Sequence, residues 1–253
     1  MSTTTTTALG FIYPDHAAED DYPLAERLLR EAGIDVSLNV AHIYGTDLHA
    51  IPELLDLGSP DKLADGASLL ADADPAAVIW ACTSGSFVYG PDGAPKQVAA
   101  LAQASRVAAS STSFAFVNAA KHLGVSRVAV AASYPDDVAQ LFVQFLAAAG
   151  IEVLGMSSAG IDTAAEVGTL TSDQVCELAA SNDRLDAQAL LIPDTAMHTI
   201  GVLQQLEAQL GKPVLTANQV TIWEALRLAN ITAVQPALGA LFNERPHYGD
   251  VRS

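Results

Sequence analysis

The stretch "VIWACTSGSF", residues 78–87, sets the pattern from which the fold is predicted. Its apolar first half ends at Cys82, and a turn of hydroxyl-bearing residues and glycine follows at once. A short apolar run that is bounded by turn residues is typical of a buried strand. The sequence therefore places one of the chain's two cysteines at the point where a strand ends.

Other short apolar runs have the same character, and amphipathic helical patterns separate them. In residues 137–150, for example, apolar side chains recur at helical spacing as far as Gly150, and glycine often ends a helix. Such alternation indicates an α/β fold with parallel sheets, in which ligands bind beyond the carboxyl ends of the strands. The strands are expected at residues 8–13, 35–42, 77–82, 127–132, 188–193 and 213–217.

The same pattern occurs twice along the chain. The segments "VIWACTS" (78–84) and "LLIPDTA" (190–196) both run from an apolar strand to a reactive side chain and then to threonine. The segments "FIYPDH" (11–16) and "AASYPDD" (131–137) both end a strand in Tyr-Pro-Asp. We therefore expect two pseudo-symmetric lobes with the active site in the cleft between them. The predicted units are an N-terminal lobe of residues 8–117 plus 215–253, a C-terminal lobe of residues 118–214, and a disordered leader of residues 1–7.

The composition narrows the classes of partner. Half of the 253 residues are apolar and the formal net charge is −17, so we expect no binding to nucleic acid or to anionic membranes, which need a Lys/Arg surface. No apolar run reaches the roughly 18 residues of a membrane helix, and the N-terminus does not resemble a signal peptide, which predicts a cytoplasmic protein. We expect neither a metal nor a nucleotide cofactor, because zinc-type Cys/His spacing and Gly-rich phosphate loops are missing.

Two interpretations of Cys82 remain open from the residues alone. A free cysteine is often a small buried hydrophobe, but the polar neighbours here favour a reactive thiol. A thiol just before a helix N-terminus has a lowered pKa, because the helix dipole and the free N–H groups favour the thiolate. The same N–H groups, together with the hydroxyls of Thr83 and Ser84, can bind a carboxylate and stabilise it as an enediolate.

Asp194 also has two possible roles. It can cap a helix that begins at Thr195, or it can face Cys82 across the cleft as a second acid–base group, and the two roles can coexist. His198 follows four residues later, so on a helix it would share a face with Asp194. It is then either a second acid–base group, a residue that orients Asp194, or an ordinary surface histidine.

The residues at two further strand ends also have more than one possible role. Tyr134 either covers a helix start or donates its phenol proton to a substrate carboxylate. Tyr13, Asp15 and His16 occupy the equivalent loop of the first lobe and carry the same alternatives. The second cysteine, Cys176, lies among apolar residues at helical spacing and is expected to be core packing.

Several of these segments resemble a known family. "ACTSGSF", "AASYPDDV", "GIDTAAEVG" (160–168) and "NQVTIWEALRLA" (218–229) are similar to the cofactor-independent aspartate/glutamate racemase superfamily. Within it the resemblance is to the branch of maleate cis-trans isomerase and arylmalonate decarboxylase. It implies two flavodoxin-like lobes, a homodimer, and carbanion chemistry on a small carboxylate with a cysteine at each of two strand ends. Cys82 matches the first of these cysteines, and Asp194 stands at the second.

The resemblance also implies a set of substrate contacts. Two asparagines that bind substrate in maleate isomerases correspond here to Ala17 or Ala18 and to Ala164. Arylmalonate decarboxylases hold a carboxylate at positions that match Thr83, Ser84, Tyr134 and the backbone at Thr195. The substrate-binding positions expected in this chain are thus Pro14, Asp15, His16, Thr83, Ser84, Tyr134, Ala164 and Thr195.

Three functions follow as hypotheses. The first is an isomerase or racemase, favoured because Cys82 and either Asp194 or His198 would place protic groups on both faces of a substrate carbon. The second is a decarboxylase of a substituted malonate, in which Cys82 protonates the enediolate. The third is a non-catalytic protein that binds small carboxylates on the same scaffold.

Overall fold

The protein contains two four-stranded parallel sheets, as predicted. The computed structural model describes residues 6–15 and 17–243. The strand order is β2-β1-β3-β4 in the first sheet and β6-β5-β7-β8 in the second, so the two sheets repeat one topology. The strands are β1 (Thr7–Pro14), β2 (Val36–Ile43), β3 (Ala77–Trp80), β4 (Ala108–Ser111), β5 (Arg127–Ala132), β6 (Glu152–Ser158), β7 (Ala189–Ile192) and β8 (Val214–Thr216).

The strands that were missed from the sequence differ in composition from the central strands. The central strands β3 and β7 are buried at every position, and such strands read as continuous apolar runs. The two missed strands, β4 and β6, lie at sheet edges and contain several serine residues. Their serine residues interrupt the apolar run on which the prediction depended.

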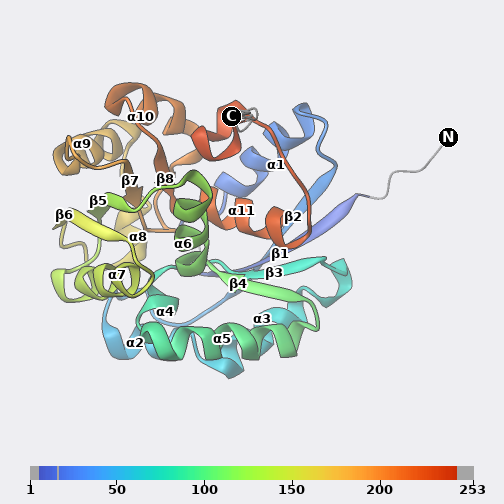
Figure 1. The fold of residues 1–253 in the computed structure, drawn as a ribbon. Coiled ribbons are helices and arrows are strands. Elements are labelled where there is room, and N and C mark those ends of the chain that lie inside the picture. The colour runs from blue at the N-terminus through green and yellow to red at the C-terminus, as the bar shows by residue number, and fades with distance from the viewer. Residues whose placement is uncertain (1–5, 16, 244–253) are drawn as a thin grey trace, which may run out of the picture.

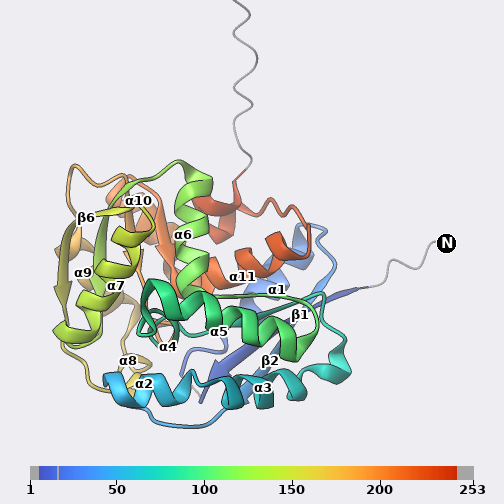
Figure 2. The same ribbon diagram turned by 60° about the horizontal axis from the view of Figure 1, so that its bottom comes forward.

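Helices cover both faces of each sheet. In Figure 1, α3 and α5 lie below the first sheet and α1 and α11 lie above it, in agreement with their contacts. The second sheet lies between α7 on one side and α9 and α10 on the other (Figure 2). The helices are α1 (Asp21–Glu31), α2 (Ile51–Leu57), α3 (Pro60–Leu69), α4 (Ser84–Phe87), α5 (Gly90–Ser105), α6 (Thr112–Leu123), α7 (Asp136–Ala148), α8 (Ala164–Val167), α9 (Ser172–Asn182), α10 (Leu203–Leu210) and α11 (Ala217–Leu228).

The two lobes are joined by α6 and α11, which pack side by side at the centre of the molecule (Figure 1). After β8 the chain returns to the first sheet, because α11 packs on β3 and β4. A capping box between Thr216 and Gln219 fixes the start of α11. One apolar cluster contains core residues of both sheets, for example Phe11 and Val130, so the lobes pack as one body.

The N-terminal boundary differs from the expected leader. Residues 1–5 lie outside the described residues, but Thr7 begins β1 and the Thr6 hydroxyl donates a hydrogen bond to Asp35 at 2.8 Å. Parallel pairing with β2 starts at Thr7, which explains why this polar residue is ordered. The other lobe boundaries remain predictions.

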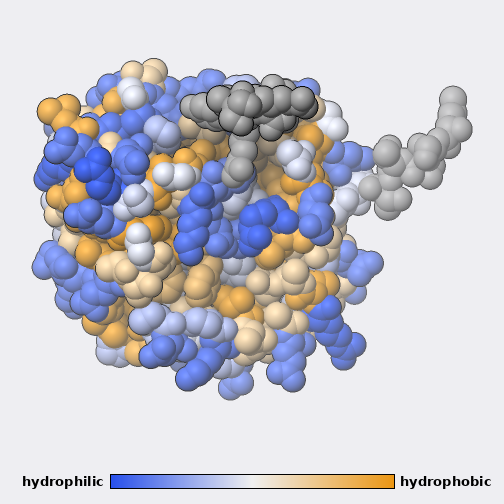
Figure 3. Space-filling model, viewed as in Figure 1, coloured by the Kyte–Doolittle hydropathy of each residue, from blue (hydrophilic) through white to orange (hydrophobic). Residues whose placement is uncertain are grey.

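On the face that Figure 3 shows, hydrophilic side chains alternate with apolar ones, which extend across the middle of the face. Within the ranges 6–15 and 17–243, no helix has the length and apolar character needed to cross a membrane.

Candidate active site

A small cavity lies between the lobes, at the carboxyl ends of strands from both sheets. Its volume, measured for the centre of a water molecule, is about 30 Å³. One water needs about 10–15 Å³ by this measure, so the cavity holds roughly two waters in this conformation. Its walls are formed by Tyr13, Pro14, Asp15, Ala17, Thr46, Asp47, Leu48, His49, Leu54, Leu57, Cys82, Ser84, Ala164, Asp194, Thr195 and Ala196.

Cys82 lies two residues beyond β3, with 4% of its surface exposed. The N–H of Gly85 donates to its Sγ at 3.3 Å, and the Ser84 hydroxyl lies 3.7 Å from the same atom. Burial raises the pKa of the Cys82 thiol from its ordinary value of 9.0 to about 11, and these hydrogen bonds only partly offset that effect. Cys82 is therefore a protonated thiol at neutral pH.

This result corrects the expectation of a lowered pKa for Cys82. That expectation relied on a helix N-terminus next to the thiol, but α4 is a single turn of four residues. The partial charge at the start of so short a helix is small, whereas removal of the thiolate from water carries a large penalty. Desolvation consequently outweighs the hydrogen bonds, and the sign of the shift is reversed.

Glycine at position 85 allows the thiol to sit against its own turn. A Cβ there would lie 2.9 Å from Trp80 Cζ2 and 3.1 Å from Cys82 Sγ. The carbonyl of Gly85 also accepts hydrogen bonds from the Trp80 indole at 3.1 Å and the Gln97 amide at 2.8 Å. These contacts fix the distance between Sγ and the N–H of Gly85.

The hydroxyl groups that follow Cys82 have different roles: some stabilise the fold and others lie at the cavity. Ser86 pairs with Ser111 at 2.7 Å and therefore serves the fold. Ser84 lines the cavity next to the thiol. The Thr83 Oγ1 is fully buried and has no hydrogen-bond partner among the described residues. A buried hydroxyl without a partner is costly in an apolar surrounding, and a bound carboxylate would satisfy it.

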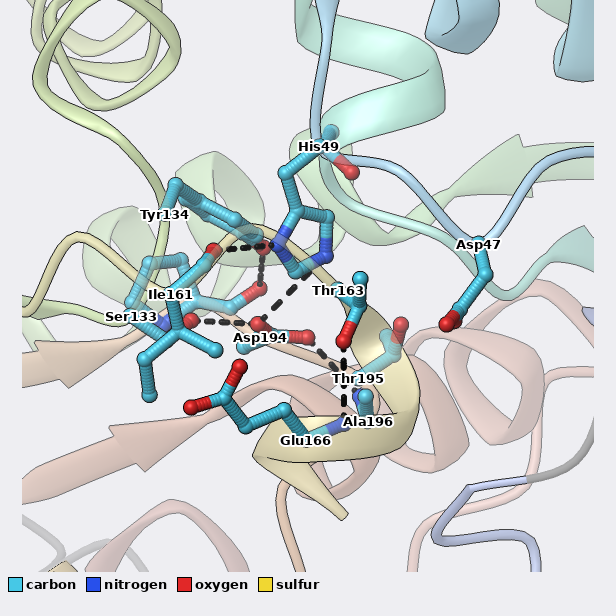
Figure 4. A network of polar contacts seen from close by, with 12 residues as sticks. Asp47, His49, Ser133, Tyr134, Ile161, Thr163, Glu166, Asp194, Thr195 and Ala196 are labelled. Atoms are coloured by element: carbon cyan, nitrogen blue, oxygen red, sulfur yellow. Dashed lines mark hydrogen bonds and ion pairs between the residues drawn. The ribbon is translucent and has the colours of Figure 1, made fainter.

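Asp194 follows β7 and lines the same cavity as Cys82. Its Oδ2 accepts a hydrogen bond from the Ser133 hydroxyl, and its Oδ1 accepts one from the N–H of Ala196 at 2.9 Å (Figure 4). Residues 193–199 are irregular, with one turn at Thr195 and Ala196, and form no helix. The predicted helix cap is therefore wrong, and the carboxylate closes its own turn.

His198 lies away from the cavity, which corrects its predicted role. Its Nδ1 is 2.9 Å from the Asp20 carboxylate, and the side chain is 37% exposed. The helical face that it was to share with Asp194 does not exist, because the N–H groups of Thr199 and Ile200 bond to the buried Asp21 carboxylate. These bonds draw the chain toward α1 before a helix can form.

The two strand-end tyrosines hold backbone on the second lobe. Tyr134 donates to the carbonyl of Pro193 at 2.7 Å, and Tyr13 donates to the carbonyl of Thr195 at 2.6 Å. Burial raises the pKa of both phenols well above the usual value, so both are neutral. Both hydroxyl protons bond to carbonyls of the turn that carries Asp194. The two tyrosines therefore hold this turn in place.

The sequence-based prediction missed one segment, residues 46–49, which crosses between the lobes. The N–H of His49 donates to the carbonyl of Asp162 at 2.8 Å, and the carbonyl of Asp47 accepts from Ala164 at 3.0 Å. Leu48 forms an antiparallel bridge with Thr163. We call residues 46–49 the strap. Its only signal in the sequence is its place after a predicted strand, because "GTDLHA" matches no motif.

His49 brings a titratable ring to the cavity wall. Its Nε2 lies 3.9 Å from Asp194 Oδ2, and its Nδ1 lies 3.1 Å from the carbonyl of Ile161 (Figure 4). The ring packs edge-on against Tyr134, with the centroids 5.0 Å apart. The residues described in the structure contain no group of three or more His, Cys, Asp or Glu side chains able to hold a metal ion.

The structure brings most of the predicted site together. Cys82, Ser84, Asp194, Thr195, Pro14, Asp15 and Ala164 line one cavity. Thr83 and Tyr134 are buried beside it, and His198 is outside it. His16 lies outside the described residues.

Comparisons with known proteins agree with this architecture. The family model for arylmalonate decarboxylase matches residues 58–242. Arylmalonate decarboxylase from Bordetella bronchiseptica is 31% identical over 73% of this chain and 78% of that protein. Maleate isomerase from Geobacillus stearothermophilus is 26% identical over 74% of this chain and 78% of that protein.

A solved structure shows the same fold. Maleate cis-trans isomerase from Nocardia farcinica, with a covalently bound succinylcysteine intermediate, superposes with a TM-score of 0.86. The alignment covers 94% of this chain and 99% of that one at 22% identity. With the family model matching most of its length, the chain belongs to the arylmalonate decarboxylase family, whose curated relatives are decarboxylases and isomerases.

Proposed function

We propose that this enzyme decarboxylates a small substituted malonate and that the Cys82 thiol protonates the resulting carbanion. The observation that carries the proposal is the state of Cys82, whose buried thiol stays protonated at neutral pH on the wall of the cavity. The family of the chain and its 31% identity to an arylmalonate decarboxylase support the same chemistry.

The reaction needs one proton and no redox partner. When the carbon–carbon bond to the leaving carboxylate breaks, carbon dioxide departs and the electron pair stays on the α carbon as an enediolate. Cys82 gives its proton to that carbon, and solvent later returns a proton to the thiolate. The N–H of Gly85, which donates to Sγ at 3.3 Å, stabilises the thiolate for the moment it exists.

The remaining carboxylate needs hydrogen-bond donors, and we assign this role to the hydroxyl of Ser84 on the cavity wall and to that of Thr83, which is buried beside it. The buried Thr83 Oγ1 has no hydrogen-bond partner among residues 6–15 and 17–243, and Ser84 lines the cavity. Among the described residues, no Lys or Arg side chain lines the cavity. The leaving carboxylate fits best against the apolar part of the wall at Leu48, Leu54 and Leu57, where loss of its charge relieves the cost of desolvation.

A second candidate is the isomerase or racemase that the sequence favoured. Asp194 supports it, because this carboxylate lines the same cavity as Cys82 from the other lobe. Addition of a cysteine to a double bond, however, needs a thiolate, and the raised pKa of Cys82 opposes thiolate formation. We therefore rank decarboxylation first. The hypothesis of a non-catalytic binding protein ranks below both, because the curated relatives are enzymes.

The test is a pair of product assays on the purified protein. Phenylmalonate is expected to release carbon dioxide, whereas maleate is expected to give no fumarate. Replacement Cys82→Ala should lower the rate of carbon dioxide release by about 10²- to 10⁴-fold, the usual contribution of a general acid. The matched control is Cys176→Ala, which removes the other free cysteine, on α9, and should leave the rate unchanged. Fumarate formation without carbon dioxide release would favour the second candidate.

A further inference from the structure

We infer that His49 and Asp194 share one exchangeable proton and form a second proton donor, on the wall of the cavity opposite Cys82. The inference rests on the proposed decarboxylation for its catalytic meaning. It adds His49, which the sequence did not indicate, to the residues that act on substrate.

The first step is the tautomer of His49. Its Nδ1 lies 3.1 Å from the carbonyl oxygen of Ile161, and a carbonyl only accepts hydrogen bonds. Nδ1 therefore carries a hydrogen. In a neutral imidazole, Nε2 then has a lone pair and no hydrogen. This is the atom that faces Asp194 Oδ2 at 3.9 Å (Figure 4).

The second step concerns the contact between Nε2 and Oδ2. Two hydrogen-bond acceptors without a proton between them repel each other when both are buried. The side chains of His49 and Asp194 are only 5% and 3% exposed, so water screens their repulsion poorly. A proton between Nε2 and Oδ2 turns this repulsion into an ion pair. The other groups around the ring do not supply that proton: the Tyr134 hydroxyl donates to Pro193, and the Ser133 hydroxyl already donates to Asp194.

The third step is access to substrate. Both His49 and Asp194 line the cavity, as Cys82 does. Cys82 follows β3 and Asp194 follows β7, which occupy the same place in the two repeated sheets. The 3.9 Å between Nε2 and Oδ2 exceeds a direct hydrogen bond, so the proton resides on Nε2 of His49, held by the charge of Asp194, and remains available to a group inside the cavity.

The chemistry balances without a further reactant. After carbon dioxide leaves, the electron pair on the α carbon takes the proton from Nε2 of His49, which leaves a neutral imidazole with its hydrogen on Nδ1. Solvent returns the proton to the pair. Because Cys82 and Asp194 follow equivalent strands of two different sheets and line one cavity, we expect this donor to deliver the proton to the other face of the carbanion and to yield the opposite configuration of product.

One test needs no substrate, so it stands even if the proposed function fails. Protein with ¹⁵N-labelled histidine is compared by NMR at neutral pH as wild type and as Asp194→Asn, and His49→Gln identifies the signals. Both ring nitrogens of His49 are expected to carry a proton in the wild type, and Nε2 should lose its proton in Asp194→Asn. A wild-type ring whose Nε2 carries no proton would overturn the inference.

The second test reads the face of protonation. Methylphenylmalonate gives a chiral monocarboxylate, so the enantiomers made by wild type and by Cys82→Ala can be compared. The slow residual product of Cys82→Ala should have the opposite configuration, and adding His49→Gln should lower that residual rate at least ~10-fold. Adding His198→Gln instead is the matched control, because this histidine also pairs with an aspartate but lies outside the cavity. Equal residual rates in the two double variants would contradict a donor role for His49.

Discussion

At the scale of single residues, the state of Cys82 decides the chemistry. Its place at a strand end was predictable, because an apolar run meets a hydroxyl-rich turn in the sequence. The direction of its pKa shift could not be predicted, because burial by residues distant in the sequence outweighs the local hydrogen bonds. The irregular segment after Asp194 could not be predicted either. The hydrogen bonds that prevent a helix there come from Asp21 on α1, which is distant in the sequence.

The raised pKa of Cys82 makes stability depend on pH in the alkaline range. The unfolded chain loses the thiol proton near pH 9.0, whereas the folded protein holds it until about pH 11. The stabilisation is thus fully present below the lower value and is lost as pH rises through the higher one. Two pKa units correspond to about 2–3 kcal/mol. Denaturant unfolding at several alkaline pH values should show this loss in wild type and a smaller one in Cys82→Ser; parallel curves for the two proteins would contradict it.

Gly85 is the residue at which the packing around the thiol is tightest. In Gly85→Ala the new methyl group must displace Trp80 or Sγ, which lie 2.9 Å and 3.1 Å from its position. We expect the free energy of unfolding to fall by about 1–3 kcal/mol, the usual cost of overpacking, and kcat to fall with it. The control is Gly201→Ala, whose methyl group meets only Leu24 at 4.0 Å. Calorimetry and turnover should separate the two variants, and equal behaviour would disprove the steric argument.

At the scale of elements, the strap controls how the cavity is closed. The cavity as it stands holds roughly two waters, so an aryl substrate requires the strap to move and then to close again. The strap is held to the second lobe by backbone bonds around Thr163 and by the Asp47 carboxylate, which accepts from Ala165 at 3.0 Å. The sequence did not reveal the strap, because it pairs across the lobes with a short segment that leads into the single turn of α8.

Removal of the Asp47 side chain should weaken closure without disturbing the fold. Asp47→Ala loses one hydrogen bond to Ala165, worth about 1 kcal/mol, so KM for phenylmalonate should rise several-fold. Asp47→Asn keeps an acceptor oxygen at the same place and should restore most of the affinity. Steady-state kinetics on both variants is the measurement. A similar KM in Asp47→Ala and wild type would show that the strap does not close on substrate.

At the scale of the whole molecule, the repeated topology places the site between two similar sheets. The duplication was visible in the sequence, because the central strands β1, β3, β5 and β7 are buried and therefore apolar. The polar contacts between the lobes were not visible in the sequence, since each depends on a single residue such as Asp21. The homodimer and the cytoplasmic location remain predictions.

Asp21 is the buried carboxylate that ties the lobes together. It accepts hydrogen bonds from Thr199, Ile200 and, at 3.0 Å, the Asn218 amide. Asp21→Ala leaves the N–H groups of Thr199 and Ile200 unpaired, and we expect the free energy of unfolding to fall by about 2–4 kcal/mol. The control is Asp20→Ala, which removes only an exposed ion pair and should cost less than about 1 kcal/mol. Denaturant unfolding compares the two, and a loss in Asp21→Ala no greater than in the control would contradict this role.

The central claim, that the protonated thiol of Cys82 is the active form, is tested most directly by the pH profile of kcat/KM for carbon dioxide release from phenylmalonate. This ratio reports the ionisation of groups in the free enzyme. The account predicts that Cys82 does not limit the rate at neutral pH and that activity falls only as the pH approaches about 11, where the thiol ionises. Activity that instead rises with pH as the Cys82 thiolate forms would identify the thiolate as the reactive species and contradict the account.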